Sequence, residues 1–443
     1  MKLYAPWEKA FKKVSTPFEH FIHSQTTTGL ILMVMTILAL SLANTTALTD
    51  SYAHFFHTKI NISVGLWQFS QTIHHWINDG LMTLFFFVIG LEIKREILVG
   101  ELSNIKVAIL PVLAAIGGMA FPALIYFYIN AGGVGEAGWG IPMATDIAFA
   151  ISALVLLGKR IPTTLVTFLV ALAIVDDLGA VLVIAVFYTD QIHILPLVLA
   201  GGSFLIMIAL NRFGIHAVSP YFIVGIFMWF FTLESGVHAT ISGVIAAMAI
   251  PSKPKRAPLG FVEKTQDLLD TYENYPVCEN HLLHERQKAI LINIEDRIKE
   301  IGTPAARLEH GLHLPVALVV IPLFALANAG IAIDFSSISS IIIEPISVGV
   351  IAGLVFGKVI GIYGVSYLAI KLKIAQLPQN SNMSQIFGVA FLGGIGFTMS
   401  IFVAELAFLG DPAMLLQAKI GILFASLFAG LFGYLWLRFV ATK

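Results

Sequence analysis

The chain has 443 residues, of which 57% are hydrophobic and only 12% are charged, about half the charged fraction of a soluble domain. No water-soluble packing of this length hides so much apolar surface, which excludes a cytosolic enzyme and a disordered chain. The lone cysteine, Cys278, excludes a disulfide scaffold, and 26 basic against 27 acidic residues give no basic excess for binding nucleic acid. We therefore predict an all-α polytopic membrane protein whose surroundings are a lipid bilayer.

Apolar windows mark twelve candidate transmembrane spans, because a helix needs about 20 apolar residues to cross a bilayer. The windows cover residues 26–44, 72–93, 107–129, 139–157, 163–188, 194–210, 217–232, 238–250, 314–332, 346–370, 385–408 and 414–437. No small-residue cleavage site follows the charged N-terminal stretch, so a cleaved signal peptide is not expected.

Basic residues fix the predicted orientation, because cytoplasmic loops are enriched in Lys and Arg. With the N-terminus inside, all of the 26 basic residues except Lys59, Lys358 and Lys419 fall on the inner side. Both termini are thus predicted to be cytoplasmic. The predicted organisation is a cytoplasmic N-terminus (1–25), spans one to eight (26–250), a charged cytoplasmic insert (251–313), spans nine to twelve (314–437) and a cytoplasmic C-terminus (438–443).

Two connections depart from the pattern of short loops. The first outer loop, about 45–71, contains HTKINISVGLWQF, whose alternating residues suit either a strand pair used for self-association or a plain loop. The insert ends in ERQKAILINIEDRIKEIG, whose apolar spacing predicts an amphipathic helix after a flexible region. Cys278, His281 and His284 within it suit either a metal site or, far more commonly, a polar loop.

Two adjacent carboxylates, Asp176 and Asp177, lie in the middle of the fifth window with about a dozen apolar residues on either side. A charge at this depth costs at least about 2.5–3.5 kcal/mol and usually faces a cavity or a partner. Successive helical residues point about 100° apart, so one aspartate can face a cavity while the other reaches a neighbouring helix. Such a pair can exchange protons near neutral pH and can also offer hard oxygen ligands to a cation.

Asp146 and Lys358 are the other deep charges. Asp146 follows Thr145 in a span that Pro142 interrupts. Its carboxylate could either neutralise the positive N-terminal ends of the broken helices or coordinate the transported ion directly. Lys358 lies among glycines spaced four residues apart, which permit close helix packing, and Asp176 or Asp177 is its expected partner. Three carboxylates against one lysine leave an acidic interior, which favours a small cation as the transported species.

A second interrupted span is the eleventh, where Gly393, Gly394 and Gly396 weaken the helix. The interruptions in spans 4 and 11 occupy corresponding places in two groups, spans 3–5 and 10–12, whose orientations in the membrane are opposite. We therefore predict inverted-topology repeats with two discontinuous helices and a site where these helices cross.

Five motifs resemble the bacterial NhaA Na⁺/H⁺ antiporters, which are themselves a type example of inverted repeats. They are ATDIAF (144–149), IVDDLGA (174–180), SGVHAT (235–240), FALANAG (324–330) and GGIGFTMSIF (393–402). The resemblance implies that Asp176 and Asp177 bind Na⁺ and protons, with Thr145 and Asp146 at the helix crossing and Lys358 as basic partner. It also implies that Asp79, in WINDGLM, lies in the cation pathway.

Members of this family are activated by rising pH through acidic and histidine residues on the cytoplasmic side. The matching candidates here are Glu92, Glu96, Glu309, His310 and His313, with His238 as a further candidate near an outer end. Histidine titrates near neutrality, which suits a sensor, although solvated helix ends account equally well for these residues. The long insert departs from the family's usual short loop, and Glu405 is atypical.

The resulting prediction is a pH-regulated secondary transporter that exchanges cytoplasmic Na⁺ and Li⁺ for external H⁺. We expect it to lie in the bacterial inner membrane as a homodimer, without enzymatic activity or cofactor. An intramembrane aspartyl protease is the first rival, but it needs its two aspartates on facing helices rather than in adjacent positions. A cation channel is the second, but it would more commonly carry a repeated pore motif.

Overall fold

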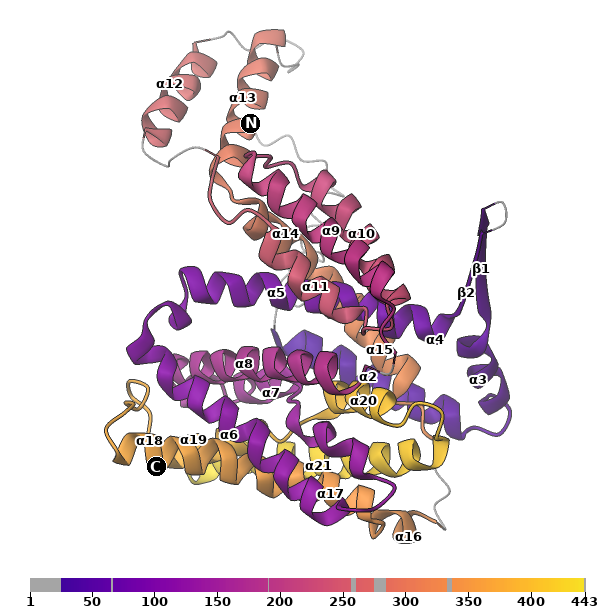
Figure 1. Ribbon diagram of the computed structural model, residues 1–443. Coiled ribbons are helices and arrows are strands. Elements are labelled where there is room, and N and C mark those ends of the chain that lie inside the picture. Colours follow the sequence, from indigo (N-terminus) through magenta and orange to yellow (C-terminus); the bar gives the residue numbers. More distant parts are fainter. Residues whose placement is uncertain are drawn as a thin grey trace, which may run out of the picture.

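The computed structural model describes residues 25–64, 67–189, 191–255, 260–274, 284–332 and 337–441. Within these residues, eight helices are long and apolar enough to cross a membrane. A ninth span is obtained when the bent pair α19 (Met383–Leu392) and α20 (Phe397–Ala407) is taken together. The protein is thus a multi-pass membrane protein built of helices, with one small strand pair (Figure 1).

Each of the twelve predicted windows lies mostly on helical residues, although twelve crossings remain a prediction. The segments up to the insert are α2 (Gln25–Asn44), α4 (Ile73–His75), η1 (Trp76–Leu81), α5 (Met82–Leu98), α6 (Ile105–Asn130), η3 (Glu136–Met143), α7 (Ile147–Val155), α8 (Thr163–Phe187), α9 (Ile194–Arg212), α10 (Val218–Glu234) and α11 (Thr240–Ala249). Those after it are α14 (Pro304–Pro315), η5 (Val316–Val320), α15 (Ile321–Asn328), α17 (Pro345–Ala352), η6 (Gly353–Gly357), η7 (Ile360–Gly364), α18 (Val365–Lys371), α19, α20 and α21 (Pro412–Phe439). Short connecting helices are α3 (Thr49–His57), η2 (Glu101–Ser103), η4 (Gly158–Arg160) and α16 (Ile338–Ile342).

The helices pack around two main apolar cores. The larger core joins α6, α7, α8 and α17 to α21 and includes Leu154, Leu172 and Phe391. The smaller core joins α5, α9, α10, α11 and α14 around Leu91 and Met207. In Figure 1 the helices α9, α10, α11 and α14 form a tilted group above the bundle that contains α6, α8, α17 and α21. Most of these helices are apolar all round, as expected where lipid or other helices cover every face.

The first outer loop contains a β-hairpin, so the strand-pair prediction is confirmed and the plain loop is wrong. Strands β1 (Lys59–Val64) and β2 (Trp67–Thr72) are antiparallel, with Ile62 opposite Phe69. The hairpin stands away from the helices in Figure 1, and Ile60 and Ile62 are 43% and 42% exposed.

The charged insert contains two helices rather than one. The predicted amphipathic helix is confirmed as α13 (Glu285–Ile301). The flexible region predicted before it is wrong over α12 (Phe261–Glu273), where Phe261, Leu268, Leu269 and Tyr272 recur at helical spacing between charged residues. Cys278 and His281 lie outside the described residues. Among those described, no three His, Cys, Asp or Glu side chains are placed to hold a metal ion.

Glycines allow the segment from α17 to α18 to pack closely on α6. A Cβ atom at Gly357 would lie 2.6 Å from the Cα atom of Pro122, and one at Gly361 would overlap the backbone of Gly117. Neither backbone can move aside as a flexible side chain does. The glycines therefore permit the close helix packing that their spacing predicts. This packing places Lys358 at the centre of the bundle.

Candidate functional site

The fourth window is interrupted beside Asp146. The 3₁₀ segment η3 ends at Met143, residues 144–146 are not helical, and α7 begins at Ile147. Pro142 lacks an N–H group and disfavours continuation of a helix through this region. Asp146 is the N-cap of α7, and its Oδ1 atom accepts a hydrogen bond from the backbone N–H of Phe149 at 3.1 Å. The interruption thus leaves backbone groups of Thr145 and Asp146 without hydrogen-bond partners in their own helix, inside the bundle.

The eleventh window is interrupted beside its glycines. Helix α19 ends at Leu392, α20 begins at Phe397, and their axes differ by 47°. Gly393, Gly394 and Gly396 all lie in this break. A Cβ atom at Gly394 would overlap the carbonyl oxygen of Leu354, so a larger residue there would push the neighbouring segment away. The glycines therefore allow both the bend and the close approach of η6.

The two interruptions contact each other directly. The backbone N–H of Asp146 donates to the carbonyl oxygen of Ile395 at 2.6 Å, and the hydroxyl of Thr145 donates to that of Gly393 at 2.8 Å. The hydroxyl of Ser400 donates to the carbonyl oxygen of Ile141 at 2.8 Å. Backbone groups that each break leaves unpaired are thus satisfied by the other break, as buried polar groups require.

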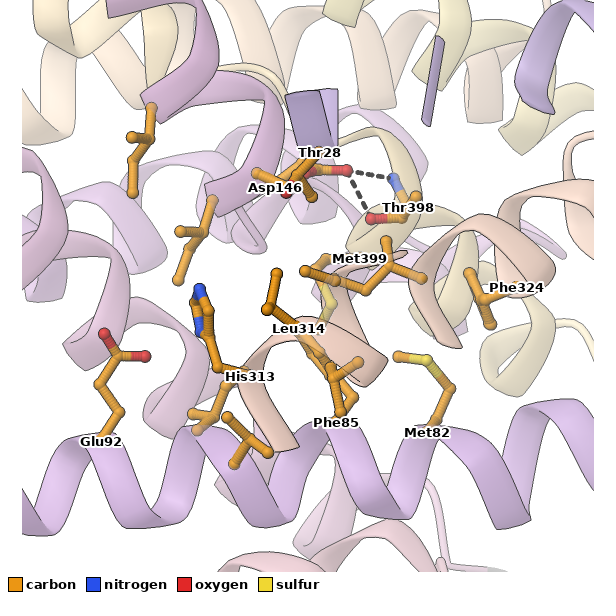
Figure 2. Close-up of a pocket in the computed structure, with 18 of the residues that line it drawn as sticks. Thr28, Met82, Phe85, Glu92, Asp146, His313, Leu314, Phe324, Thr398 and Met399 are labelled. Atoms are coloured by element: carbon orange, nitrogen blue, oxygen red, sulfur yellow. Dashed lines mark hydrogen bonds between the residues drawn. The ribbon is translucent and has the colours of Figure 1, made fainter. Parts of the chain in front are cut away.

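Asp146 also stabilises the start of α20. Its Oδ2 atom accepts hydrogen bonds from the backbone N–H of Thr398 at 3.0 Å and from the Thr398 hydroxyl at 2.5 Å (Figure 2). One carboxylate therefore lies at the N-terminal ends of both α7 and α20, where the helix dipoles favour negative charge. Of the two roles considered for Asp146, this geometry directly supports the electrostatic one.

Asp176 and Asp177 lie on α8 next to this crossing and are completely buried. The ammonium group of Lys358, which is equally buried, donates to Asp176 Oδ2 at 2.6 Å and to the Thr145 hydroxyl at 2.9 Å. Asp176 is thus the partner of Lys358, and Thr145 connects the lysine to the helix crossing.

Three carboxylate oxygens of the aspartate pair have no hydrogen-bond donor among the described residues. They are Oδ1 of Asp176 and both oxygens of Asp177. Buried carboxylates without donors are costly, because nothing compensates for the water that they have lost. Such oxygens are suited to binding a proton or a small cation.

Lys358 lies between two π-helical turns, η6 and η7. Asp79 likewise lies in a π-helical turn, η1. Turns of this kind are rare and are frequent at functional sites, since the extra residue locally rearranges the hydrogen bonds of the helix. Apart from the glycines around Lys358, no sequence pattern signals these turns.

A cavity of about 420 Å³ leads to the crossing. Figure 2 shows Glu92 and His313 at one end of it, Asp146 and Thr398 along its wall, and Phe324 at the opposite end. Most of its remaining lining is apolar. The cavity connects Glu92 to Asp146, and the orientation predicted from the basic residues places the Glu92 end on the cytoplasmic side.

The cytoplasmic candidates gather around Arg95. Its guanidinium lies 3.0 Å from carboxylate oxygens of both Glu96 and Glu309, and 3.7 Å from Glu92. His310 and His313 line the cavity on the same helix as Glu309. This helix, α14, begins at Pro304, ten residues before the predicted start of its span at 314, because Thr303 caps it and Pro304 suits its first turn. Arg95 is the member of the cluster that the sequence analysis did not single out.

Asp79 and His238 lie apart from the crossing. The carboxylate of Asp79 is 3.1 Å from Nδ1 of His75, one helical turn earlier. His238 is hydrogen-bonded through Nε2 to the carbonyl oxygen of Tyr188 at 2.6 Å. Neither residue is ion-paired or hydrogen-bonded to the cluster around Arg95, and the orientation predicted from the basic residues places both toward the outer side.

Comparison with known proteins gives a consistent result over the whole chain. The family described as Na⁺/H⁺ antiporter 1 matches residues 19–437. A Na⁺/H⁺ antiporter NhaA of Sulfurimonas denitrificans is 69% identical over 443 residues, covering all of both chains. The Na⁺/H⁺ antiporter NhaA 1 of Saccharophagus degradans is 50% identical, covering 98% of this chain and 93% of its own, and an NhaA of Acidithiobacillus ferrooxidans is 47% identical over 97% and 98%.

Proposed function

Because the chain belongs to the Na⁺/H⁺ antiporter 1 family, we propose that it exchanges cytoplasmic Na⁺ for external protons by alternating access. The observation that carries this proposal is the pair of buried aspartates with three carboxylate oxygens free of any donor in the described part of the chain. Protons and Na⁺ compete for these oxygens, so a site that has bound Na⁺ cannot bind protons at the same time. This competition by itself couples the transport of Na⁺ to the transport of protons.

In the proposed cycle, Na⁺ reaches the crossing through the cytoplasmic cavity and displaces protons from Asp176 and Asp177. Binding of Na⁺ weakens the attraction between Asp176 and Lys358, because the cation partly neutralises the carboxylate. Movement of the two interrupted spans then exposes the site outward, where Na⁺ leaves past Asp79 and protons bind. Lys358 re-pairs with Asp176 as the cation departs. Thr145 and Asp146 hold the interrupted helices together and contribute oxygens at the crossing.

The finer properties belong to the same proposal. Li⁺ shares the charge of Na⁺ and its preference for oxygen ligands, so we expect it to be exchanged as well. Glu92, Glu96, Glu309, His310 and His313 surround the cytoplasmic entrance, where their protonation would regulate entry of cations. His238 is a further candidate for the pH response from the outer side. The setting is the bacterial inner membrane, with both termini in the cytoplasm, and the carrier works as a homodimer.

The test uses inverted membrane vesicles that hold a pH gradient reported by a fluorescent indicator. Addition of NaCl or LiCl should dissipate the gradient with the wild-type protein and should have no effect with Asp177→Asn. Asp296→Asn is the matched control, because it makes the same carboxylate-to-amide change on the exposed helix α13. Failure of Na⁺ to dissipate the wild-type gradient anywhere between about pH 6.5 and 9 would contradict antiport.

A further inference from the structure

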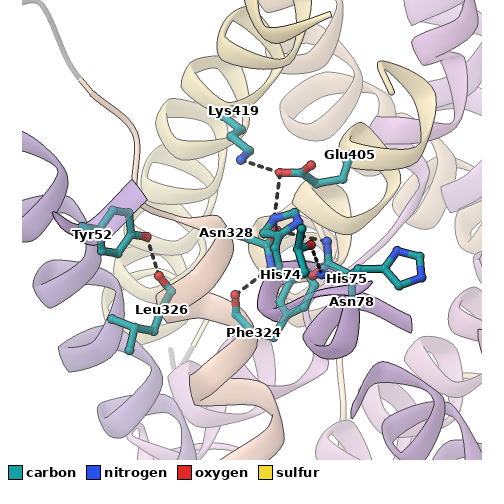
Figure 3. Close-up of polar contacts among 10 residues, drawn as sticks. Tyr52, His74, His75, Asn78, Phe324, Leu326, Asn328, Glu405 and Lys419 are labelled. Carbon is teal, nitrogen blue, oxygen red and sulfur yellow. Dashed lines mark hydrogen bonds and ion pairs between the residues drawn. The ribbon is translucent and has the colours of Figure 1, made fainter. Parts of the chain in front are cut away.

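One ion pair between α20 and α21, together with the polar residues beside it, forms a network that has no part in the site described above. The ammonium group of Lys419 lies 2.6 Å from Oε1 of Glu405, and Nε2 of His74 lies 4.0 Å from the same oxygen (Figure 3). The Lys419 and Glu405 side chains are only 11% and 14% exposed. Lys419 is one of the three basic residues that fall outside the cytoplasmic side, and Glu405 compensates its charge.

The network extends to two further segments through hydrogen bonds. Nε2 of His74 is 2.9 Å from Oδ1 of Asn328 on α15, and the amide of Asn328 donates to Oδ1 of Asn78 in η1 at 2.9 Å. Asn78 directly precedes Asp79, the candidate for the outer cation pathway. The contacts of Glu405 therefore join α20 and α21 to the segments that carry Asp79 and Asn328.

Helix α20 is held at both ends by carboxylates. At its N-terminus, Thr398 is hydrogen-bonded to Asp146, and near its C-terminus Glu405 pairs with Lys419. The seven residue steps from Thr398 to Glu405 span about 10 Å, so the helix is too short to bend appreciably. A tilt of α20 that opened the crossing to the outside would pull Glu405 away from its partners. An ion pair in this partly buried setting is stronger than one in water and resists such separation.

We propose that Glu405 is a positioning residue whose network with Lys419 and His74 holds the outer face of the crossing closed while the cytoplasmic cavity is open. The network separates when the site turns outward and forms again when it returns inward. This role rests on the proposed antiport and deepens it, since it assigns the contacts that the outward movement must break.

The test compares the two faces of the membrane. The half-saturating Na⁺ concentration of exchange is measured in inverted vesicles and in right-side-out vesicles, and the ratio of the outer to the inner value is taken. Na⁺ on one side of the membrane binds only to protein that is open to that side, so its apparent affinity falls as the fraction of such protein falls. The ratio of the two half-saturating concentrations therefore reports the equilibrium between the inward-open and outward-open forms. Glu405→Gln and Lys419→Met should each lower the ratio at least about threefold, because both remove the attraction that favours the inward-open form.

Two controls separate this role from a general loss of stability. The charge exchange Glu405→Lys with Lys419→Glu should restore the ratio toward the wild-type value. Glu295→Gln removes an ion pair of equal length, 2.6 Å to Lys299, from the exposed surface of α13 and should leave the ratio unchanged. An unchanged ratio in both Glu405→Gln and Lys419→Met, with an active wild type, would refute the role of Glu405 alone. Absence of exchange in the wild type would refute the antiport on which it rests.

Discussion

The ammonium nitrogen of Lys358 lies 2.6 Å from Oδ2 of Asp176, whereas the adjacent Asp177 has no hydrogen-bond donor among the described residues. Two identical side chains in consecutive positions therefore have different surroundings. The difference follows from helical geometry, since successive residues point about 100° apart and only one can face Lys358. Asp176 is compensated by a charge, and Asp177 is left for a proton or a cation.

Removing only the carboxylate of the Asp176–Lys358 pair should destabilise the protein. Asp176→Asn leaves Lys358 as an uncompensated buried charge, and removal of one partner of a buried pair costs about 3–5 kcal/mol. We expect a clear fall in the thermal unfolding midpoint in detergent. The double change Asp176→Asn with Lys358→Met should recover most of the midpoint but no exchange. Equal midpoints for the single and double variants would contradict the compensation.

Loss of the bridge between the two interrupted helices should weaken cation binding more than stability. Thr398→Val removes the 2.5 Å hydrogen bond to Asp146 while keeping the shape of the side chain, and we expect the half-saturating Na⁺ concentration to rise severalfold. Asp411→Ala is the matched control, because it removes an N-cap from α21 at the surface and should cost about 1 kcal/mol of stability. This control should not change the half-saturating concentration. A similar rise in both variants would show that helix capping in general, not the crossing, sets the affinity.

Arg95 should set the pH at which exchange begins. Burial raises the pKa of the Glu309 carboxyl, and the guanidinium of Arg95, 3.0 Å away, lowers it. Arg95→Gln removes the lowering effect, so Glu309 keeps its proton to a higher pH and the activity profile should move in the alkaline direction. The maximal rate at high pH should be retained. A profile measured between about pH 6 and 9 that stayed in place, or moved toward acid, would exclude this role.

The close approach of η6 to α6 should not tolerate a methyl group. A Cβ atom at Gly357 would meet the Cα atom of Pro122 at 2.6 Å, whereas nothing lies within 4 Å of one at Gly364. Gly357→Ala should therefore lower the yield of folded protein and its unfolding midpoint, and Gly364→Ala should not. Size-exclusion chromatography and thermal unfolding of the two variants provide the comparison.

The exposed hairpin predicts how two copies associate. Ile60 and Ile62 leave apolar surface on β1 uncovered, and the free edge of a two-stranded sheet can pair with another strand. With Cys278 replaced by Ser, Ile62→Cys should form a cross-linked dimer in membranes, while Ile292→Cys on the exposed face of α13 should not. Equal cross-linking of both variants would point to random collision instead.

The features that depend on local composition follow from the amino-acid sequence alone. Its scarcity of charge required a membrane, because so much apolar surface cannot be covered in water. Pro142 and the glycines at 393, 394 and 396 determined where two helices are interrupted, since these residues act on the backbone near them. The alternation of HTKINISV and WQFS made a strand pair one of two expected forms of this loop, and the structure shows the strand pair. The deep charges Asp146, Asp176, Asp177 and Lys358 were also evident, because a charge stands out in an apolar window.

Which of these groups contact one another depends on how the helices pack. Periodicity gives the spacing of residues on one helix but not how that helix is turned toward its neighbours, so Asp176 rather than Asp177 could not be assigned to Lys358 beforehand. The same holds for Arg95 between Glu96 and Glu309, and for Asp146 as a ligand of the α20 N-terminus. Glu405 is atypical and Lys419 lies off the predicted inner face, but the sequence does not show that these two residues and His74 lie together. The tertiary structure places the side chains of Lys419 and His74 next to Glu405, and the opposite charges of Glu405 and Lys419 compensate each other there.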